Sequence, residues 1–450
     1  MEKILANENR IKEISEKMAN YKTAFLDDLT KILSIPSVNA SATEKYPYGK
    51  ATADALDQFL EIAKTMGFKT HNYDYQVGYA EFGEGDKMIA VLCHLDVVPA
   101  GEGWEHDPFE PRIKDGKIFA RGVADNKGPA IANLYAMKAL MDEGFKPDCR
   151  IRLIVGLNEE TGFGCMKHYH KIGGEMPYAG YTPDAAFPAV FAEKGIIRIS
   201  FKKSRKLFNK GIEINWLKAG EAVNMVPQVC RYQLQENGEL LSEQEIEGKA
   251  AHASRPELGK NAIIEAIKKI KSDYPNLEDS LIDLYQKHLI RHIDGKDMGI
   301  NCSDISGELT MNLGLIDINP VEINFTLDIR YPVTFEGKEI IAKLKENMNK
   351  LDFELDSSYD EKPLNLGHDS QMIQTAMKIY NDNMGTNDEA VAMGGGTYAR
   401  SIPNVFAFGA VFPGTTDSMH QVNENASVNH LLAASYIYKE TLKTFAEKLI

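Results

Sequence analysis

The chain has 450 residues, enough for two or three domains that each bury a hydrophobic core of their own. Hydrophobic residues make up 43% and charged residues 26%, which is typical of globular proteins and excludes a disordered or collagen-like chain. The 51 basic and 65 acidic residues give a formal net charge of −14. We therefore expect no nucleic-acid partner, because phosphate contacts need a basic surface.

The sequence also bears on location. Met1–Ile4 lead into charged residues and not into the apolar segment of a signal peptide. The longest apolar run, Val405–Phe412, is far shorter than the roughly 20 residues that cross a bilayer. The five cysteines form no CxxC pair, which favours reduced thiols. We expect a cytoplasmic protein without membrane contact.

The first half of the chain alternates between helical and strand patterns. Apolar residues at spacings of three and four predict helices, and a continuous apolar run predicts a strand buried on both faces. A strand, a helix and a second strand in succession indicate a crossover in a parallel sheet, and hence an α/β domain. The predicted elements are helices over Ile11–Ile32, Ala51–Met66 and Asn126–Glu143, and strands over Lys87–Cys93 and Arg150–Leu157.

The middle of the chain has a different texture. Alternating apolar and polar residues over Gly195–Phe201 and Val321–Asp328 predict half-exposed antiparallel strands, with helices near Asn261–Lys271 and Leu277–His288 between them. The α/β texture then returns with a helix over 369–384, a strand over Asn404–Val411 and a helix from Val428. The simplest organisation is a catalytic domain of residues 1–192 and 366–450, with an inserted α+β domain of residues 193–365.

Polar side chains follow the two buried strands of the first half. His94 and Asp96 follow one strand, Glu159 and Glu160 follow the next, and Asp125 stands at the start of the helix between them. Ligands gather at the carboxyl ends of parallel strands, so we expect these groups at one edge of the sheet. Buried carboxylates repel each other unless a positive charge lies among them. The residues therefore predict one or two divalent cations, and imidazole with carboxylate ligands suits zinc, manganese or cobalt.

Several longer motifs follow one another along the chain, namely Cys93–Pro99, Ala120–Gly128, Asn158–Gly162, Tyr181–Pro188, Gly248–Pro256, Gly259–Ala262 and His420–Glu424. Further features are Asn224, Asp328–Arg330, Gly394–Arg400 and a long insertion. The motifs occur in the order found in the M20 metallopeptidases, a family that the chain resembles over almost its whole length. The further features make it most similar to the PepV-type dipeptidases, which are related to Xaa-His dipeptidases and carnosinases. The resemblance implies a mixed, mostly parallel sheet with a Zn-peptidase-like fold and an inserted α+β lid domain.

The same resemblance implies a set of metal ligands. Asp125 would bridge two divalent ions. His94 and Asp184 would complete the ligands of one ion, and Glu160 and His420 those of the other. Zinc is the first choice for both positions, with manganese or cobalt as alternatives.

The remaining roles that the resemblance implies concern catalysis and substrate binding. Glu159 would be the general base, and Asp96 would orient the His94 ring. His252, together with Asn224, would stabilise the oxyanion, although on its own a histidine in this position is more often structural. A further set would bind the substrate, with Arg330 on its carboxylate, and consists of Asn224, Arg330, Gly395, Gly396 and Thr397. Without the resemblance, Arg330 would be interpreted as a surface ion pair and the glycine run as a flexible turn.

These expectations amount to a metal-dependent dipeptidase that takes a small peptide. A deacylase or amidohydrolase of N-acyl amino acids is the alternative, since related proteins share the metal site. A non-catalytic metal-binding protein is disfavoured because Glu159 and every ligand position are filled. The long insertion favours a monomer in which His252 acts within its own chain.

Overall fold

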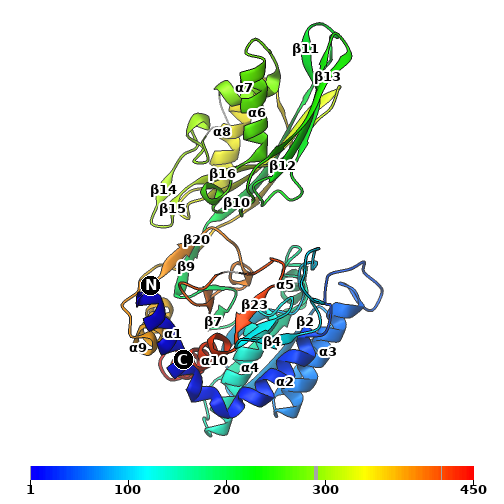
Figure 1. The fold of residues 1–450 in the computed structure, drawn as a ribbon. Helices are drawn as coiled ribbons and strands as arrows, with labels where there is room; N and C mark the ends of the chain where they lie inside the picture. The colour runs from blue at the N-terminus through cyan, green and yellow to red at the C-terminus, as the bar shows by residue number, and fades with distance from the viewer. Residues whose placement is uncertain (1, 288–291, 417) are drawn as a thin grey trace. The chain divides into compact units, whose positions relative to one another are not determined.

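The computed structural model describes residues 2–287, 292–416 and 418–450 (Figure 1). The chain forms two compact units. Unit 1 comprises Met1–Phe191, Leu366–Val391 and Gly396–Ile450, and unit 2 comprises Ala192–Asn365 and Ala392–Gly395. Because the short segment 392–395 groups with unit 2, the chain passes between the units at four points.

A nine-stranded mixed sheet organises unit 1. Its strand order is β1-β2-β6-β3-β7-β21-β9-β19, with β20 beside β9, and the four central strands β6, β3, β7 and β21 run parallel. Not all of its strands lie within unit 1, because β9 and β20 each cross a unit boundary and β19 belongs to unit 2. The strands are β1 (Lys69–Tyr73), β2 (Val77–Gly83), β3 (Met88–His94), β6 (Arg150–Gly156), β7 (Ala179–Thr182), β9 (Ala189–Glu193), β19 (Leu364–Asn365), β20 (Val391–Met393) and β21 (Val405–Phe408).

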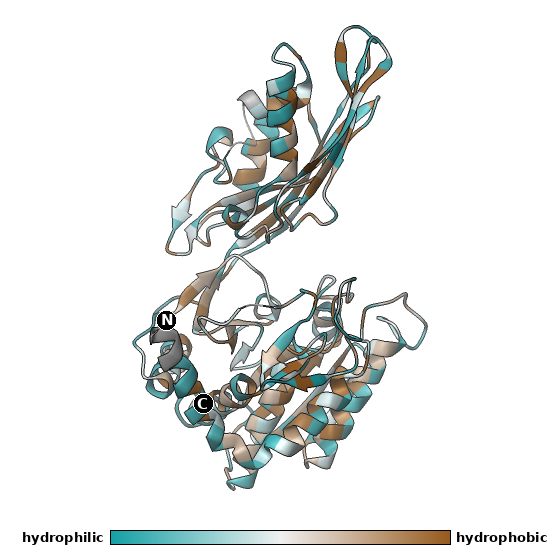
Figure 2. Ribbon diagram, in the orientation of Figure 1, coloured by the Kyte–Doolittle hydropathy of each residue, from teal (hydrophilic) through white to brown (hydrophobic). Residues whose placement is uncertain are grey.

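Some helices of the unit pack against this sheet and others pack on those helices. Apolar residues concentrate in the sheet and in the helix faces turned toward it (Figure 2). The helices are α1 (Glu2–Ser15), α2 (Lys22–Leu33), α3 (Lys50–Thr65), α4 (Lys127–Asp142), α5 (Gly164–Lys171), α9 (Gln371–Met384) and α10 (Val428–Lys448). Short strands complete the unit: β4 (Arg112–Lys114), β5 (Lys117–Phe119) and β23 (Asn425–Ser427) form one small sheet, and β8 (Ala185–Ala186) pairs with β22 (Ala410–Val411).

The predicted α/β crossover is confirmed. Every residue of β3 is buried, as its continuous apolar run requires. β3 and β6 are parallel neighbours, and α4 connects them. Their register pairs His94 with Gly156, so both strands end at the same edge of the sheet.

Two predicted elements of unit 1 are wrong in their continuity. The helix over Ile11–Ile32 is interrupted by a 3-10 helix, Glu16–Tyr21, between α1 and α2. A spacing of three residues fits 3-10 geometry as well as α geometry, so the apolar pattern could not reveal the change. The strand over Asn404–Val411 is divided into β21 and β22 at Gly409, whose positive φ of 78° breaks the extended backbone.

Unit 2 is an antiparallel seven-stranded sheet in the order β13-β12-β11-β16-β17-β10-β18. Three helices cover one face of it (Figure 1). The predicted α+β texture is therefore confirmed, although His288, where one helix was expected to end, lies outside the described residues. The elements are β10 (Gly195–Ser204), β11 (Ile212–Ala219), β12 (Val229–Glu236), β13 (Glu239–Glu247), β16 (Thr310–Ile318), β17 (Glu322–Tyr331), β18 (Glu354–Glu361), α6 (Ala262–Asp273), α7 (Ser280–Lys287), α8 (Gly337–Asn349) and the hairpin of β14 (Ser303–Asp304) with β15 (Gly307–Glu308).

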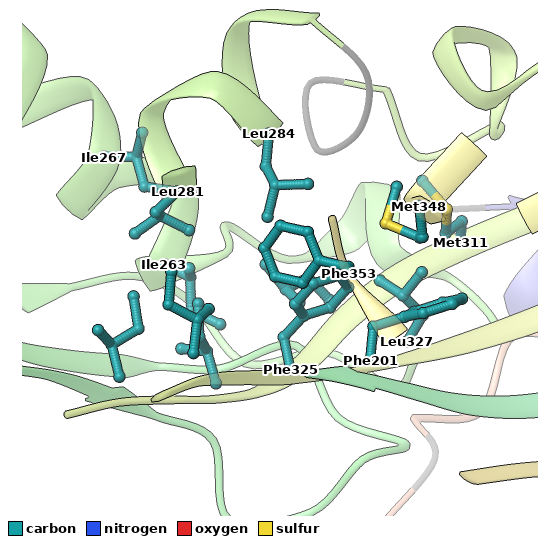
Figure 3. Close-up of a cluster of buried hydrophobic side chains, with 14 of the residues drawn as sticks. Phe201, Ile263, Ile267, Leu281, Leu284, Met311, Phe325, Leu327, Met348 and Phe353 are labelled. Atoms are coloured by element: carbon teal, nitrogen blue, oxygen red, sulfur yellow. The ribbon is translucent and has the colours of Figure 1, made fainter. Parts of the chain in front are cut away.

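Unit 2 has a hydrophobic core of its own (Figure 3). Phe325 of β17 and Phe353 pack edge to face, with ring centroids 5.4 Å apart, and Ile263 and Ile267 of α6 are fully buried in the same cluster. Asn261 begins α6 as its N-cap, because its Oδ1 accepts a hydrogen bond from the Ile263 backbone amide at 3.0 Å. In the part of the chain that the structure describes, no helix of either unit has the length and apolar character to span a membrane.

Candidate metal centre

The predicted ligands of unit 1 come from one edge of its sheet. His94 ends β3, the glutamate pair follows β6, and Asp184 follows β7. These three strands are adjacent and parallel, so the residues after them meet at the same edge. Asp125 stands two residues before α4, and His420 lies in the loop between β22 and β23. The structure thus brings together all five, namely His94, Asp125, Glu160, Asp184 and His420.

Asp125 lies between two imidazole rings. Its Oδ1 is 2.9 Å from His94 Nε2, and its Oδ2 is 2.9 Å from His420 Nε2. His420 Nε2 is also 3.2 Å from the Glu160 carboxylate, and His94 Nε2 is 3.9 Å from Asp184 Oδ2. The Asp125 carboxylate therefore points one oxygen at each histidine, an arrangement that suits a bridging ligand.

Two groups of potential ligand atoms have all members within 4.8 Å of one another. One group is His94, Glu159 and Asp184, and the other is His94, Asp125 and Glu160. Both groups contain imidazole nitrogen and carboxylate oxygen and neither contains a thiolate, a donor set that fits zinc or manganese. Residues of this kind and spacing can hold divalent ions.

The pKa values of the clustered side chains also favour a bound cation. Burial and the nearby Asp184 raise the pKa of Glu159 well above its usual value, and burial and Asp125 raise the pKa of Asp184 to about 8. Burial disfavours the charged form of His420, yet hydrogen bonds with Asp125 and Glu160 raise its pKa to about 11. Burial also acts on Asp125, but hydrogen bonds from the two histidines lower its pKa. Burial and the close approach of several carboxylates thus favour states in which a proton or a cation offsets the negative charge.

Asp96 contacts both the His94 ring and the loop that carries the glutamate pair. Its backbone carbonyl lies 2.9 Å from His94 Nδ1, and its carboxylate oxygen lies 3.5 Å from the same nitrogen. With Nδ1–H donating to Asp96, the Nε2 of His94 is the acceptor nitrogen that a metal needs. The Asp96 carboxylate also accepts hydrogen bonds from the backbone amides of Glu159 and Glu160, at 3.1 and 3.2 Å. Asp96 thus fixes the loop of the glutamate pair as well as facing the ring.

In unit 2, His252 lies on an exposed loop that pairs with the segment around Asn224. The Ala253 amide donates to the Asn224 carbonyl at 2.8 Å, and His252 forms a β-bridge with Met225. His252 Nδ1 accepts a hydrogen bond from the Ser254 amide at 3.2 Å, with the Ser254 hydroxyl at 2.7 Å. With Nδ1 as acceptor, the proton of the neutral ring is on Nε2.

Arg330 forms an ion pair, as the plain interpretation expected, but the pair is buried and not on the surface. It is 2% exposed at the end of β17, and its Nε and Nη2 donate to the two oxygens of Asp328, at 2.5 and 3.1 Å. Its Nη1 donates to the Gly394 carbonyl at 2.9 Å. Gly394 also approaches the His252 loop, since a Cβ there would lie 2.8 Å from Ser254 Cβ. The Arg330 guanidinium, Gly394 and the His252 loop are thus neighbours within unit 2.

The predicted set Gly395, Gly396 and Thr397 spans a boundary between the units. Gly395 is the last residue of unit 2, and the other two belong to unit 1. Thr397 Oγ1 accepts the Ala399 amide at 3.1 Å and so caps a 3-10 helix, Tyr398–Arg400. The glycine run is therefore anchored at both ends, by Arg330 and by this cap.

Comparison with known proteins decides the family. Residues 90–444 match the peptidase family M20/M25/M40. The chain belongs to this family. The family prediction from the motifs is confirmed, and this M20 peptidase is a hydrolase that is expected to use a divalent metal.

The relatives of this M20 peptidase extend over its whole length. A Bacillus subtilis (strain 168) protein named "Putative dipeptidase YtjP" is 35% identical over 460 residues, which are 95% of this chain and 98% of that protein. A Staphylococcus haemolyticus (strain JCSC1435) protein, also named as a dipeptidase, is 34% identical over 464 residues with the same two coverages, 95% and 98%. The structure of human carnosine dipeptidase 1 has a TM-score of 0.62 at 13% identity, over 97% of this chain and 99% of that one. The structural likeness shows a shared fold.

The sequence interpretation missed several residues that hold the site of this M20 peptidase together. Asn39 donates to Asp96 Oδ2 at 3.3 Å, and Glu424 accepts hydrogen bonds from Arg121 and from the loop that ends at Asp125. Arg121 and Glu424 both lie inside the family motifs, which was the available signal. Their pairing could not be derived from the sequence, because they are 303 positions apart.

Proposed function

We propose that this M20 peptidase is a metal-dependent dipeptidase that uses two divalent ions, with zinc as the first candidate and manganese or cobalt as alternatives. The proposal rests on one observation, the convergence of two histidines and three carboxylates at one sheet edge with Glu159 beside them. The names of relatives that are 34–35% identical over almost the whole chain support the substrate class.

In this proposal, Asp125 would be a ligand of both ions. Its two oxygens face different histidines, each at 2.9 Å. His94 and Asp184 would complete the ligands of one ion, and Glu160 and His420 would complete those of the other. The short separations within each pair, 3.9 Å for His94 and Asp184 and 3.2 Å for His420 and Glu160, support this division.

Glu159 acts as the general base. Bound divalent ions supply Lewis acidity and lower the pKa of a coordinated water toward neutrality. Glu159 accepts the proton of the attacking water and delivers it to the leaving amine. Its position supports this role, since the Asp96 carboxylate fixes the backbone amides of both Glu159 and Glu160.

His252 stabilises the oxyanion that develops on the scissile carbonyl. Because Nδ1 accepts the Ser254 amide, the Nε2–H is the donor that such an oxyanion requires. Asn224, whose carbonyl holds the His252 loop at Ala253, belongs to the same subsite. Unit 2 then serves as the lid domain of a catalytic domain built on unit 1.

Recognition of the free carboxylate explains why short peptides are preferred. A guanidinium has five N–H groups, and three of those of Arg330 donate to Asp328 and Gly394. We assign the other two to the C-terminal carboxylate of a dipeptide, a bidentate contact typical of arginine. The backbone of Gly395 and Gly396 and the Thr397 side chain complete this subsite.

A substrate panel tests the proposal. The purified enzyme is assayed against dipeptides, tripeptides, N-acetylated amino acids and dipeptides blocked at either end, with and without a chelator. A dipeptidase hydrolyses the free dipeptides fastest and loses activity with the chelator. Preference for the N-acetylated compounds would instead identify a deacylase of N-acyl amino acids, and equal rates on tripeptides and blocked dipeptides would contradict the proposal.

We also propose that the enzyme is a cytoplasmic monomer in which His252 acts on the active site of its own chain. The long insertion that forms unit 2 supports the monomer, because a large lid can supply the histidine without a second subunit. Analytical ultracentrifugation checks this expectation. A tight dimer that loses activity on dilution would contradict it.

A further inference from the structure

A buried ion pair contacts the two loops that carry Asp125 and His420. Glu424 is 0% exposed and Arg121 is 1% exposed, and Arg121 Nη1 donates to Glu424 Oε2 at 2.8 Å. A buried pair of this kind is costly to desolvate, and it is retained only where further hydrogen bonds satisfy both partners. Here the Glu424 carboxylate and both Nη groups of Arg121 hydrogen-bond to backbone groups of the surrounding loops, whereas Arg121 Nε has no hydrogen-bond partner among the described residues.

Glu424 holds the loop that ends at Asp125. Its Oε1 accepts the amides of Ala124 and Asp125, at 2.8 and 3.2 Å, and its Oε2 accepts the amide of Gly122 at 3.0 Å. The backbone carbonyl of Glu424 accepts the Ala120 amide at 3.1 Å. One carboxylate thus fixes three of the four amides from Gly122 to the bridging ligand.

Arg121 holds the loop that carries His420. Its Nη1 donates to the Gln421 carbonyl at 3.2 Å, and its Nη2 donates to the carbonyls of Pro99 and Ala100, at 3.2 and 3.1 Å. His420 needs such support, because its φ of 61° is in the left-handed region that a residue with a Cβ rarely adopts. The loop can keep this conformation only if its surroundings impose it.

We propose that Arg121 and Glu424 are positioning residues that set the distance between Asp125 and His420 before any ion binds. The pair joins two loops that are about 300 positions apart in the chain, at the point where each presents a ligand. Hydrogen bonds that orient metal ligands typically change affinity about 10- to 100-fold. This proposal rests on the proposed metal centre, but it makes no use of the peptide substrate.

Metal affinity of the purified apo chain tests the proposal without any assay of turnover. Zinc is titrated against a chromophoric chelator into the wild type, E424Q and the matched control E81Q. Glu81 also forms a buried pair in the same unit, with Arg152, and the two residues are 6% and 5% exposed. This pair lies within strands β2 and β6 and not at the ligand loops. We expect both variants to melt at a lower temperature than the wild type, and only E424Q to bind zinc about 10- to 100-fold more weakly.

Equal zinc affinity in E424Q and the wild type would overturn the proposal. If E424Q does not fold, R121K replaces it, since lysine keeps the charge but cannot form the fork to Gln421 and Pro99. Its zinc affinity is expected to fall in the same way, and an unchanged value would overturn the proposal.

Hydrogen exchange of the unmodified apo chain gives a third result that depends on no variant. The amides of Gly122, Ala124 and Asp125 should be protected, and fast exchange there would also overturn the proposal. If the wild type binds no zinc at all, the proposed metal centre fails, and that outcome is distinct from a failure of the positioning role.

Discussion

Two clusters of buried polar side chains, one in each unit, differ in their charge balance. At the sheet edge of unit 1, carboxylates outnumber cationic groups, and burial together with the neighbouring carboxylates raises the pKa values of Glu159 and Asp184. In unit 2, the buried Asp328 is paired with the guanidinium of Arg330 through two hydrogen bonds, and Arg198 Nε lies 3.6 Å from the same carboxylate. The first cluster has more carboxylates than cations, and in the second the carboxylate is fully paired.

This difference separates a site that needs a cation from one that is complete without it. A buried ionised group must be paired or neutralised, so the cluster of unit 1 gains from a divalent ion and the pair in unit 2 does not. Our proposal accordingly places metal binding in unit 1 alone, and the side chains of Arg330 and His252, which would contact the substrate carboxylate and the oxyanion, in unit 2. Each of the following predictions challenges that division.

The largest effect is expected for Asp125→Ala. Removing the ligand that faces both histidines should abolish metal binding and turnover together. Asp328→Asn in unit 2 is the matched control, and it should retain both ions while raising KM, because Arg330 loses its partner. Metal analysis by mass spectrometry and steady-state kinetics measure both. An Asp125→Ala protein that still binds two ions would break the division.

The adjacent glutamates should differ sharply. Glu159→Gln should lower kcat about 10²- to 10⁴-fold with the metal content unchanged, as loss of a general base does. Glu160→Gln should lower the metal content instead. The same two measurements are made on both variants, and loss of metal from Glu159→Gln would show that Glu159 is a ligand.

His252→Ala should lower kcat about 10²- to 10³-fold, the usual effect of removing one oxyanion donor. Metal content and melting temperature should not change, because His252 is exposed and belongs to unit 2. His292→Ala, at another exposed histidine of unit 2, is the control. A kcat within twofold of the wild type for His252→Ala would remove unit 2 from the chemistry.

Zinc should stabilise the two units unequally. At a free concentration of about 100 times its Kd, it should raise the free energy of unfolding of unit 1 by about 2.7 kcal/mol and leave unit 2 unchanged. Hydrogen exchange followed by mass spectrometry resolves the two units. Equal protection of peptides from both units would contradict the assignment of metal to unit 1.

The smallest effects are expected at helix N-caps. Asn261→Ala removes the acceptor of the Ile263 amide in α6, and Ser370→Ala removes that of the Ile373 amide in α9. Each should cost about 1 kcal/mol of unfolding free energy in its own unit. Chemical denaturation with and without zinc measures both losses. Zinc should offset part of the unfolding free energy lost in Ser370→Ala, which lies in unit 1. An offset in Asn261→Ala would contradict the assignment of metal to unit 1.

The features that could be predicted from the sequence are those with a pattern among residues close together in the chain. The uniform burial of β3, the crossover through α4 and the polar residues after each strand could all be derived from periodicity and strand ends. The 3-10 helix Glu16–Tyr21 could not, because its three-residue spacing is also an α-helical spacing. Nor could the pairing of Arg121 with Glu424, since a buried ion pair between distant positions leaves no periodic pattern.

The site itself was predicted in two steps of different strength. The strand ends alone indicated one or two cations among His94, Asp96, Asp125 and the glutamate pair. The membership of Asp184 and His420 came only from resemblance to the family, because neither follows a pattern that distinguishes it from an ordinary loop residue. Segment 392–395 groups with unit 2 through tertiary contacts, which no property of a glycine run predicts.

The most direct test of the account is an anomalous difference map from crystals grown with zinc. The account predicts two peaks in unit 1, both in contact with Asp125, one beside His94 and Asp184 and the other beside Glu160 and His420. Peaks at other residues, or none at this edge of the sheet, would contradict the metal centre and the hydrolytic function built on it.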